Sequence, residues 1–246
     1  MNKLNLPTDK PSRILYKAGG WTSVLFLIYS FVSILIMIML DGGYPDSAIE
    51  CFEMINNNRF IALLRLDIIS IIVVPFYYLL FYSIYQALKT DHKLIANIAL
   101  FSTLAGVTIF IAGLNITSIL ILSDKYHMTT SPEMKQHLLA ACEGMLASDM
   151  WINTGAILRG ILIESGAIIF SILMLKTLIF NKATGWVGLL THGFDLLSII
   201  IGIFYAPIKD IFIMVAGPLY IVWFVMIGIR FFKLSKIKSL LSKIEQ

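Results

Sequence analysis

Ionisable side chains lie inside long apolar stretches of this chain, where a charge is costly. A charged side chain at the middle of a membrane-spanning helix raises the free energy of insertion by roughly 2.5–3.5 kcal/mol. Such residues therefore face one another, a polar cavity or a ligand, and they mark functional sites by default. The candidate ligand-binding or ion-coupling residues are Arg65, Asp67, Asn115, Arg159, Glu164, His192 and Asp195.

The depth of each candidate follows from the helical rise of about 1.5 Å per residue. Glu164 and Asp195 fall near the bilayer centre, Arg65 and Arg159 fall in the outer half, and His192 lies toward the inner surface. The two arginines, the three acids and a protonated histidine balance in charge. A carboxylate at this depth can also hold a proton, because a low-dielectric environment favours the neutral acid. The set predicts a closed polar network or a proton-linked site.

Pairing on single helices is limited. His192 and Asp195 are three residues apart and share a helix face. The pair supplies two of the side chains that a metal site or an acid–base site would need. A core histidine that makes its hydrogen bonds within the protein fits the same spacing. Arg65 and Asp67 also fit a structural pair near the surface. Glu164 and Asp195, far from either surface, favour a functional cavity.

No catalytic residue is assigned from the sequence. The chain lacks the HExxH, CxxC, P-loop, GxGxxG and GxSG motifs, and Ser70 and Ser165 have no evident base nearby. No metal and no other cofactor is predicted.

The elements that carry these residues are six apolar runs. Hydrophobic residues make up 58% of the chain and charged residues 14%, whereas a soluble domain has about 25% charged residues. A membrane-spanning helix needs about 20 apolar residues. The predicted fold is an all-α polytopic membrane bundle, a single domain over 1–246 that ends in a basic tail over 233–246. Its predicted spans are 21–40, 60–88, 94–123, 154–177, 186–206 and 211–232.

The distribution of positive charge predicts the orientation. Lysine and arginine are concentrated before span 1, after spans 2 and 4 and in the tail, whereas the first outer loop is acidic. Cytoplasmic loops carry an excess of these residues, so both termini are predicted to be cytoplasmic in a multi-pass plasma-membrane protein. The basic flanks favour contact with membrane lipids over nucleic acid. No protein partner is predicted.

The outer loops 41–59 and 124–153 are predicted to form a small extracytoplasmic cap. Ser47 and Glu50 have the spacing of a capping box, and Ser131 followed by Pro132 predicts the start of an amphipathic helix between spans 3 and 4. Its apolar face is predicted to include Met134, Leu138, Cys142 and Met145. Cys51 and Cys142 fall in these two loops, so a disulfide is permitted there. Two free thiols fit the sequence equally.

Short motifs lie along most of the chain: Ala18-Gly19-Gly20, Arg65-Leu66-Asp67, Gly185-Trp186-Val187-Gly188 and the last-span residues Pro218, Trp223, Gly228 and Arg230. In these motifs the chain resembles a bacterial family of six-span integral membrane proteins of unassigned function. The resemblance implies six helices in the plasma membrane and no mechanism. Members of that family often carry an acidic residue shortly after the last-span proline. Here Tyr220 and Ile221 occupy the region, so no acidic role transfers.

These features lead to one function hypothesis and two alternatives. In the first, a polar cavity inside the membrane, open toward the outer leaflet, binds or passes a small solute or a lipid headgroup, with the arginines as anion contacts and Glu164 and Asp195 as ionisable centres. The second is an intramembrane enzyme that acts on a lipid-linked substrate. The third is a structural or regulatory membrane subunit, which needs no cavity. The sequence does not separate the three.

Overall fold

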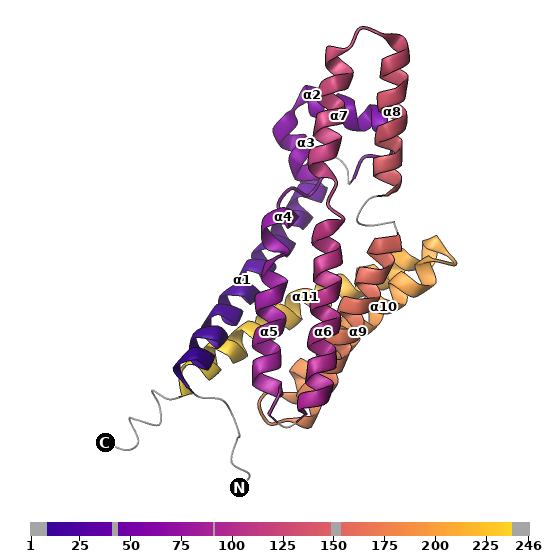
Figure 1. The fold of residues 1–246 in the computed structure, drawn as a ribbon. Helices are drawn as coiled ribbons and strands as arrows, with labels where there is room; N and C mark the ends of the chain where they lie inside the picture. Colours follow the sequence, from indigo (N-terminus) through magenta and orange to yellow (C-terminus); the bar gives the residue numbers. More distant parts are fainter. Residues whose placement is uncertain (1–8, 41–43, 91, 149–153, 238–246) are drawn as a thin grey trace.

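A computed structural model describes residues 9–40, 44–90, 92–148 and 154–237 of the chain. These residues form an all-α fold (Figure 1). The helices are α1 (Lys10–Met39), α2 (Ala48–Asn57), α3 (Arg59–Arg65), α4 (Ser70–Val73), α5 (Phe76–Leu88), α6 (Lys93–Ala112), α7 (Ile116–Met128), α8 (Pro132–Ala147), α9 (Thr154–Lys176), α10 (Lys182–Gly202) and α11 (Ala206–Ser235).

Six segments are long and apolar enough to cross a membrane, which makes the chain a multi-pass membrane protein by helix length and hydropathy. They are Lys10–Met39, Ser70–Leu88, Lys93–Met128, Thr154–Lys176, Lys182–Gly202 and Ile211–Ser235. The share of buried residues is 50% in α9 but only 17% in α1. Helix α9 is therefore the central helix of the bundle, whereas much of α1 presents apolar side chains outward, as a lipid-facing helix does.

The described residues build two apolar cores. The larger core lies in the bundle and includes Phe26, Phe81, Phe170 and Trp223. The smaller core joins α2, α3, α7 and α8 into the cap, with Phe52 at its centre. Figure 1 shows these four helices at one end of the molecule, opposite the end where α1 begins and α11 finishes.

The predicted continuous span over 60–88 is wrong in its first third. Helix α3 ends at Arg65, and the backbone turns at Asp67, which has a φ of 58°. The amide of Asp67 donates to the Leu64 carbonyl at 3.1 Å, and the amide of Ile68 donates to the Leu63 carbonyl at 3.0 Å. This is the hydrogen-bond pattern of a Schellman C-cap, with an aspartate at the position that usually carries glycine. The first apolar turns of the run therefore belong to the cap.

The predicted span over 94–123 is also broken. Helix α6 ends at Ala112, and α7 begins at Ile116 after the segment Gly113-Leu114-Asn115. Residues Ile116 and Ile119 of α7 are buried in the cap core. Helix α7 runs on to Met128 and pairs with α8 above the bundle (Figure 1).

The remaining spans agree with the sequence within a few residues at most ends. Helix α9 matches 154–177, and α10 and α11 contain most of 186–206 and 211–232. Helix α1 starts at Lys10, well ahead of the predicted start at 21. Of the predicted tail over 233–246, α11 continues to Ser235, and residues 238–246 lie outside the described residues.

Both predicted helix starts in the cap are confirmed. The Ser47 hydroxyl accepts from the Glu50 amide at 3.3 Å, and the Ser131 hydroxyl accepts from the Met134 amide at 3.3 Å. The return bond of the capping box goes to a different residue, since Glu50 Oε2 accepts from the Asp46 amide. Helix α8 buries Leu138 and Cys142 as predicted. Met134, which was predicted on the same face, is 49% exposed, and the buried face includes Leu146.

Candidate functional site

The candidate site lies where α9, α10 and α11 meet, and small residues allow this close approach. A Cβ atom on Gly188 of α10 would lie 2.5 Å from Ser171 Oγ of α9 and 2.5 Å from Trp223 Nε1 of α11. A Cβ on Gly160 of α9 would lie 2.4 Å from Ile199 Cδ1 of α10. These glycines bring the three helices close enough for their polar side chains to touch.

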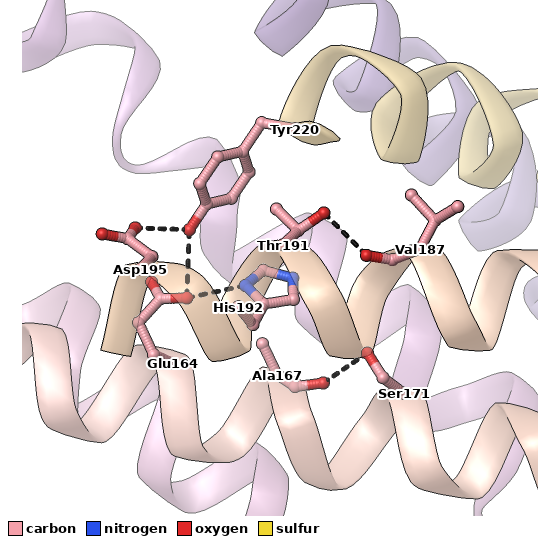
Figure 2. A network of polar contacts seen from close by, with 8 residues as sticks. All are labelled: Glu164, Ala167, Ser171, Val187, Thr191, His192, Asp195 and Tyr220. Carbon is pink, nitrogen blue, oxygen red and sulfur yellow. Dashed lines mark hydrogen bonds and ion pairs between the residues drawn. The ribbon is translucent and has the colours of Figure 1, made fainter. Parts of the chain in front are cut away.

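Four side chains form one connected polar cluster, which we call the acidic cluster: Glu164, His192, Asp195 and Tyr220. Nδ1 of His192 lies 2.7 Å from Oε2 of Glu164. The Tyr220 hydroxyl lies 3.0 Å from the same Glu164 oxygen and 2.7 Å from Oδ2 of Asp195. Figure 2 shows the Tyr220 ring reaching from α11 so that its hydroxyl stands between the two carboxyl groups.

The hydrogens of this cluster have a simple arrangement. The Tyr220 hydroxyl donates to Oε2 of Glu164 and to Oδ2 of Asp195, so one phenol proton is shared between two carboxyl oxygens. One further proton lies between Nδ1 of His192 and Oε2 of Glu164, on either the imidazole or the acid. Glu164 and Asp195, which we call the acid pair, thus meet at one hydroxyl, and mutual repulsion of two carboxylates so placed favours one proton on the pair.

The surroundings of the cluster favour this state. Glu164 and His192 are buried, at 6% and 1% exposed, whereas Asp195 is half-buried. Arg159, 8% exposed, lies within electrostatic range of Asp195, and its guanidinium group stands 3.7 Å from the centre of the Phe110 ring. One negative charge on the acid pair and one positive charge on Arg159 sum to zero.

The structure brings together four of the seven predicted residues and places three elsewhere. Arg159, Glu164, His192 and Asp195 share the centre of the bundle. The predicted relation between His192 and Asp195 is indirect, because His192 contacts Glu164 and the Tyr220 hydroxyl links Glu164 to Asp195.

Arg65, Asp67 and Asn115 lie at the junction of cap and bundle. Nη2 of Arg65 forms an ion pair with Oε1 of Glu50 at 3.3 Å. Oδ2 of Asp67 accepts from the Tyr29 hydroxyl at 2.7 Å, and Nδ2 of Asn115 donates to the Ser148 carbonyl at 3.4 Å. These contacts stabilise the breaks that follow α3 and α6.

Sequence reasoning missed Tyr220, the side chain that joins the two acids. A signal was present, because tyrosines in membrane proteins concentrate near the interfaces, whereas Tyr220 stands well inside the last span. The phenol places one donor and one acceptor at the middle of a helix that is otherwise apolar. A tyrosine at that depth indicates a buried polar partner.

The structure places a hollow away from the acidic cluster. It has a volume of about 260 Å³, is lined mainly by apolar side chains and lies between α1 and α5. At the acidic cluster the polar side chains contact one another, and the predicted polar cavity there stays a prediction. Within the described ranges, no group of three or more His, Cys, Asp or Glu side chains is placed to hold a metal ion.

The two cysteines meet in the cap core. Cys51 of α2 and Cys142 of α8 are both fully buried and are present as free thiols. A hydrogen bond from the Cys51 thiol lowers the pKa of Cys142, and the same contact together with burial raises the pKa of Cys51 far above its ordinary value. The two cysteines therefore lie close together in the cap core, and the predicted bridge between them remains a prediction.

No family model, no curated protein and no solved structure matches this chain. The six long apolar helices agree with the six-span architecture that the motif resemblance implies, and the family itself remains a prediction. Fold and helix composition define the class: an all-α, multi-pass membrane protein with a buried acidic cluster at the centre of its bundle.

Proposed function

We propose that this is an integral plasma-membrane protein that binds or passes a small solute or a lipid headgroup at the acidic cluster, in step with the binding and release of a proton. Glu164 and Asp195 are the ionisable centres, Tyr220 joins them, and Arg159 balances the remaining negative charge. The termini lie in the cytoplasm, and the cap lies outside.

One observation supports the proposal above the others. Glu164 and Asp195 share the Tyr220 hydroxyl, and Glu164 also contacts His192, in an arrangement that favours one proton on the acid pair. Loss of that proton leaves two carboxylates around one hydroxyl and one uncompensated negative charge in an apolar bundle. Because both effects raise the free energy of this closed arrangement, release of the proton favours opening of the cluster. An opened cluster exposes carboxylates and a phenol to a polar ligand.

A structural subunit is the alternative with an observation in its favour. The polar side chains contact one another directly, and interhelical hydrogen bonds of this kind hold transmembrane helices together at about 0.6–2 kcal/mol each. A cluster that serves only as a link between helices needs no ligand. An enzyme that acts on a lipid-linked substrate is not favoured by any contact beyond those that support the first proposal.

Native mass spectrometry of the protein extracted gently from its own membrane tests the proposal. The wild type is compared with the single variants Glu164→Gln and Asp195→Asn, and with the control Asp124→Asn, which removes an exposed carboxylate of the cap. We expect a discrete bound species in the wild type and the control that both site variants lose. Equal, non-selective lipid adducts on all four proteins would contradict the proposal and favour the structural role.

A further inference from the structure

The acidic cluster has one polar atom that the contacts above leave unused, Nε2 of His192. This nitrogen is fully buried and has no hydrogen-bond partner among the described residues. In Figure 2 it points away from Glu164, in the direction of the part of α10 that carries Val187. Because α10 begins at Lys182, this direction leads toward the end of the bundle where α1 begins and α11 finishes.

Further buried polar atoms follow in the same half of the bundle. Trp223, whose ring centre lies 4.7 Å from that of His192, has an indole N–H that is also buried without a partner in the described part of the chain. Closer to the end of the bundle the same is true of Thr177 Oγ1 and the Tyr16 hydroxyl, which are 7% and 1% exposed as residues. Buried polar atoms of this kind are commonly satisfied by ordered water.

We propose that the acid pair exchanges its proton with the end of the molecule that carries both termini, through His192 and water held by these buried polar atoms. The inference rests on the proposed function, because it takes the same acid pair as the site. It adds that the coupled ion is a proton, and that this proton enters from the end of the bundle where α1 begins and α11 finishes.

The transfer is balanced and involves no electron. A proton arrives on Nε2 of His192, the Nδ1 proton passes to Oε2 of Glu164, and the imidazole is left neutral as its other tautomer. Protonated Glu164 then donates to Nδ1 in the same contact, and the Tyr220 hydroxyl continues to donate to Asp195. Release follows the reverse order, and the net result is one proton moved between solvent and the acid pair.

The charged and titratable groups around His192 are compatible with this role. Glu164 of α9 contacts it directly, Tyr220 of α11 lies edge-on to its ring at 5.3 Å, and Asp195 stands one turn away on α10. Arg159 of α9 and Tyr77 of α5 lie in electrostatic range of the acid pair. Among the described residues named here, a proton on the imidazole therefore faces two acids and one fixed positive charge.

Trp223 provides a reporter for the test, since a protonated imidazole in contact with an indole quenches its fluorescence. The full chain with Trp21, Trp151 and Trp186 changed to phenylalanine retains Trp223 alone. It is reconstituted into lipid vesicles, and its orientation is read from the accessibility of tags on the termini. A rapid acid jump is then applied to one face of the membrane at a time.

We expect quenching that is several-fold faster after a jump on the terminal face than on the cap face, and that is lost in His192→Gln. The control Ser198→Ala removes another buried hydroxyl of α10 without a protein partner in the described residues, and it should leave the quenching unchanged. Equal rates from both faces, a faster response from the cap face or the absence of quenching would overturn the inference. If the sided quenching occurs while native mass spectrometry finds no bound ligand, the proton route stands and the solute proposal fails.

Discussion

At the scale of single residues, Tyr220 holds the acid pair together with one hydroxyl group. Tyr220→Phe removes that hydroxyl and keeps the ring, so two carboxyl groups lose a buried partner at once. Loss of a buried hydrogen-bond partner costs about 1–3 kcal/mol. We expect a fall of that size in the free energy of unfolding, measured by chemical denaturation in mixed micelles, together with loss of the bound species.

Tyr78→Phe is the matched control for this change. The Tyr78 hydroxyl also makes a 2.7 Å bond, to Thr108 Oγ1, but this bond is exposed and joins two neutral groups. Its removal should cost less than about 1 kcal/mol, because Thr108 Oγ1 keeps its bond to the Leu104 carbonyl oxygen at 2.8 Å. Equal losses in the two variants would contradict a special role for Tyr220.

The charge balance between the acid pair and Arg159 gives a second prediction. In Glu164→Gln or Asp195→Asn, the amide takes the place of one carboxyl group and can keep its contacts, and one negative charge remains near Arg159. In the double variant the contacts remain possible, but both negative charges of the acid pair are gone. We expect small losses of stability in each single variant, and a loss in the double variant that exceeds their sum by about 1–3 kcal/mol. Additive losses in a double-mutant cycle would show that the charges do not interact.

At the scale of elements, the contact between α6 and α9 holds the central helix in place. A Cβ on Gly166 of α9 would lie 2.7 Å from the Ala99 carbonyl oxygen and 3.1 Å from the Thr103 amide, both in the backbone of α6. Backbone atoms cannot rotate away, so Gly166→Ala forces the helices apart. We expect a loss of about 1–3 kcal/mol, seen as a lower thermal unfolding midpoint in detergent.

Gly193→Ala is the control, because a Cβ at Gly193 of α10 meets no atom within 4 Å. An alanine there improves helix propensity by up to about 1 kcal/mol and adds no contact. A lower midpoint for this variant, or an unchanged one for Gly166→Ala, would argue against the close packing of α6 on α9.

The cap carries a fourth prediction, a disulfide between Cys51 of α2 and Cys142 of α8. Both thiols are fully buried in the folded cap, so the bridge forms while the chain is still folding. The thiolate of one cysteine breaks the disulfide of an oxidoreductase to form a mixed disulfide, and the other cysteine then displaces that partner as a dithiol. A bridge that closes a loop of this length adds about 4–5 kcal/mol to stability in the loop-entropy account.

The measurement is the protein mass after alkylation under denaturing conditions, with and without prior reduction. We expect no alkylation before reduction and two alkylated thiols after it, when the protein is prepared from cells without reductant. Cys51→Ser should leave Cys142 open to alkylation in both cases. Two alkylated thiols in the unreduced wild type would refute the bridge.

Sequence patterns predicted the long elements well and their interruptions poorly, for physical reasons that differ between the breaks. Length and hydropathy suffice for α9, since an apolar run of this size has one stable form in a bilayer. The break at Asp67 is hidden, because an aspartate stands where a C-cap usually carries glycine and apolar residues flank it on both sides. At the second break, Gly113 and Asn115 are residue types that often end a helix, but long apolar stretches flank them on both sides.

For the acidic cluster, too, the sequence predicted some features and missed others. Depth along each helix singled out Glu164, His192 and Asp195, which the structure brings together, because helical rise converts directly into position. The partners across helices depend on the rotation of α9, α10 and α11 about their axes, which a single sequence does not specify. That is why Tyr220 was missed and Arg65 and Asp67 were grouped with a site they do not join.

At the scale of the whole molecule, the cap and the opposite end of the bundle differ in charge as well as in structure. The cap holds the acidic residues Asp46, Glu50 and Glu53, and two of its ion pairs, Arg59–Asp124 and Arg65–Glu50, neutralise much of its positive charge. Lysine and arginine gather at the opposite end, on the first turns of α1 and α6 and the last turn of α11. The bundle therefore presents one basic end and one acidic end to the two sides of a membrane.

The excess of positive charge on cytoplasmic loops predicts which side is which. We expect an epitope inserted in the exposed turn between α7 and α8, at residues 129–131, to be removed by protease added to intact cells, while tags on both termini are protected. Permeabilised cells should lose all three tags, which verifies that each tag can be cut. Protection of the turn and loss of the terminal tags would reverse the orientation. The proton route through His192 would then open to the outside of the cell, because the route is tied to the terminal end of the bundle and not to a side of the membrane.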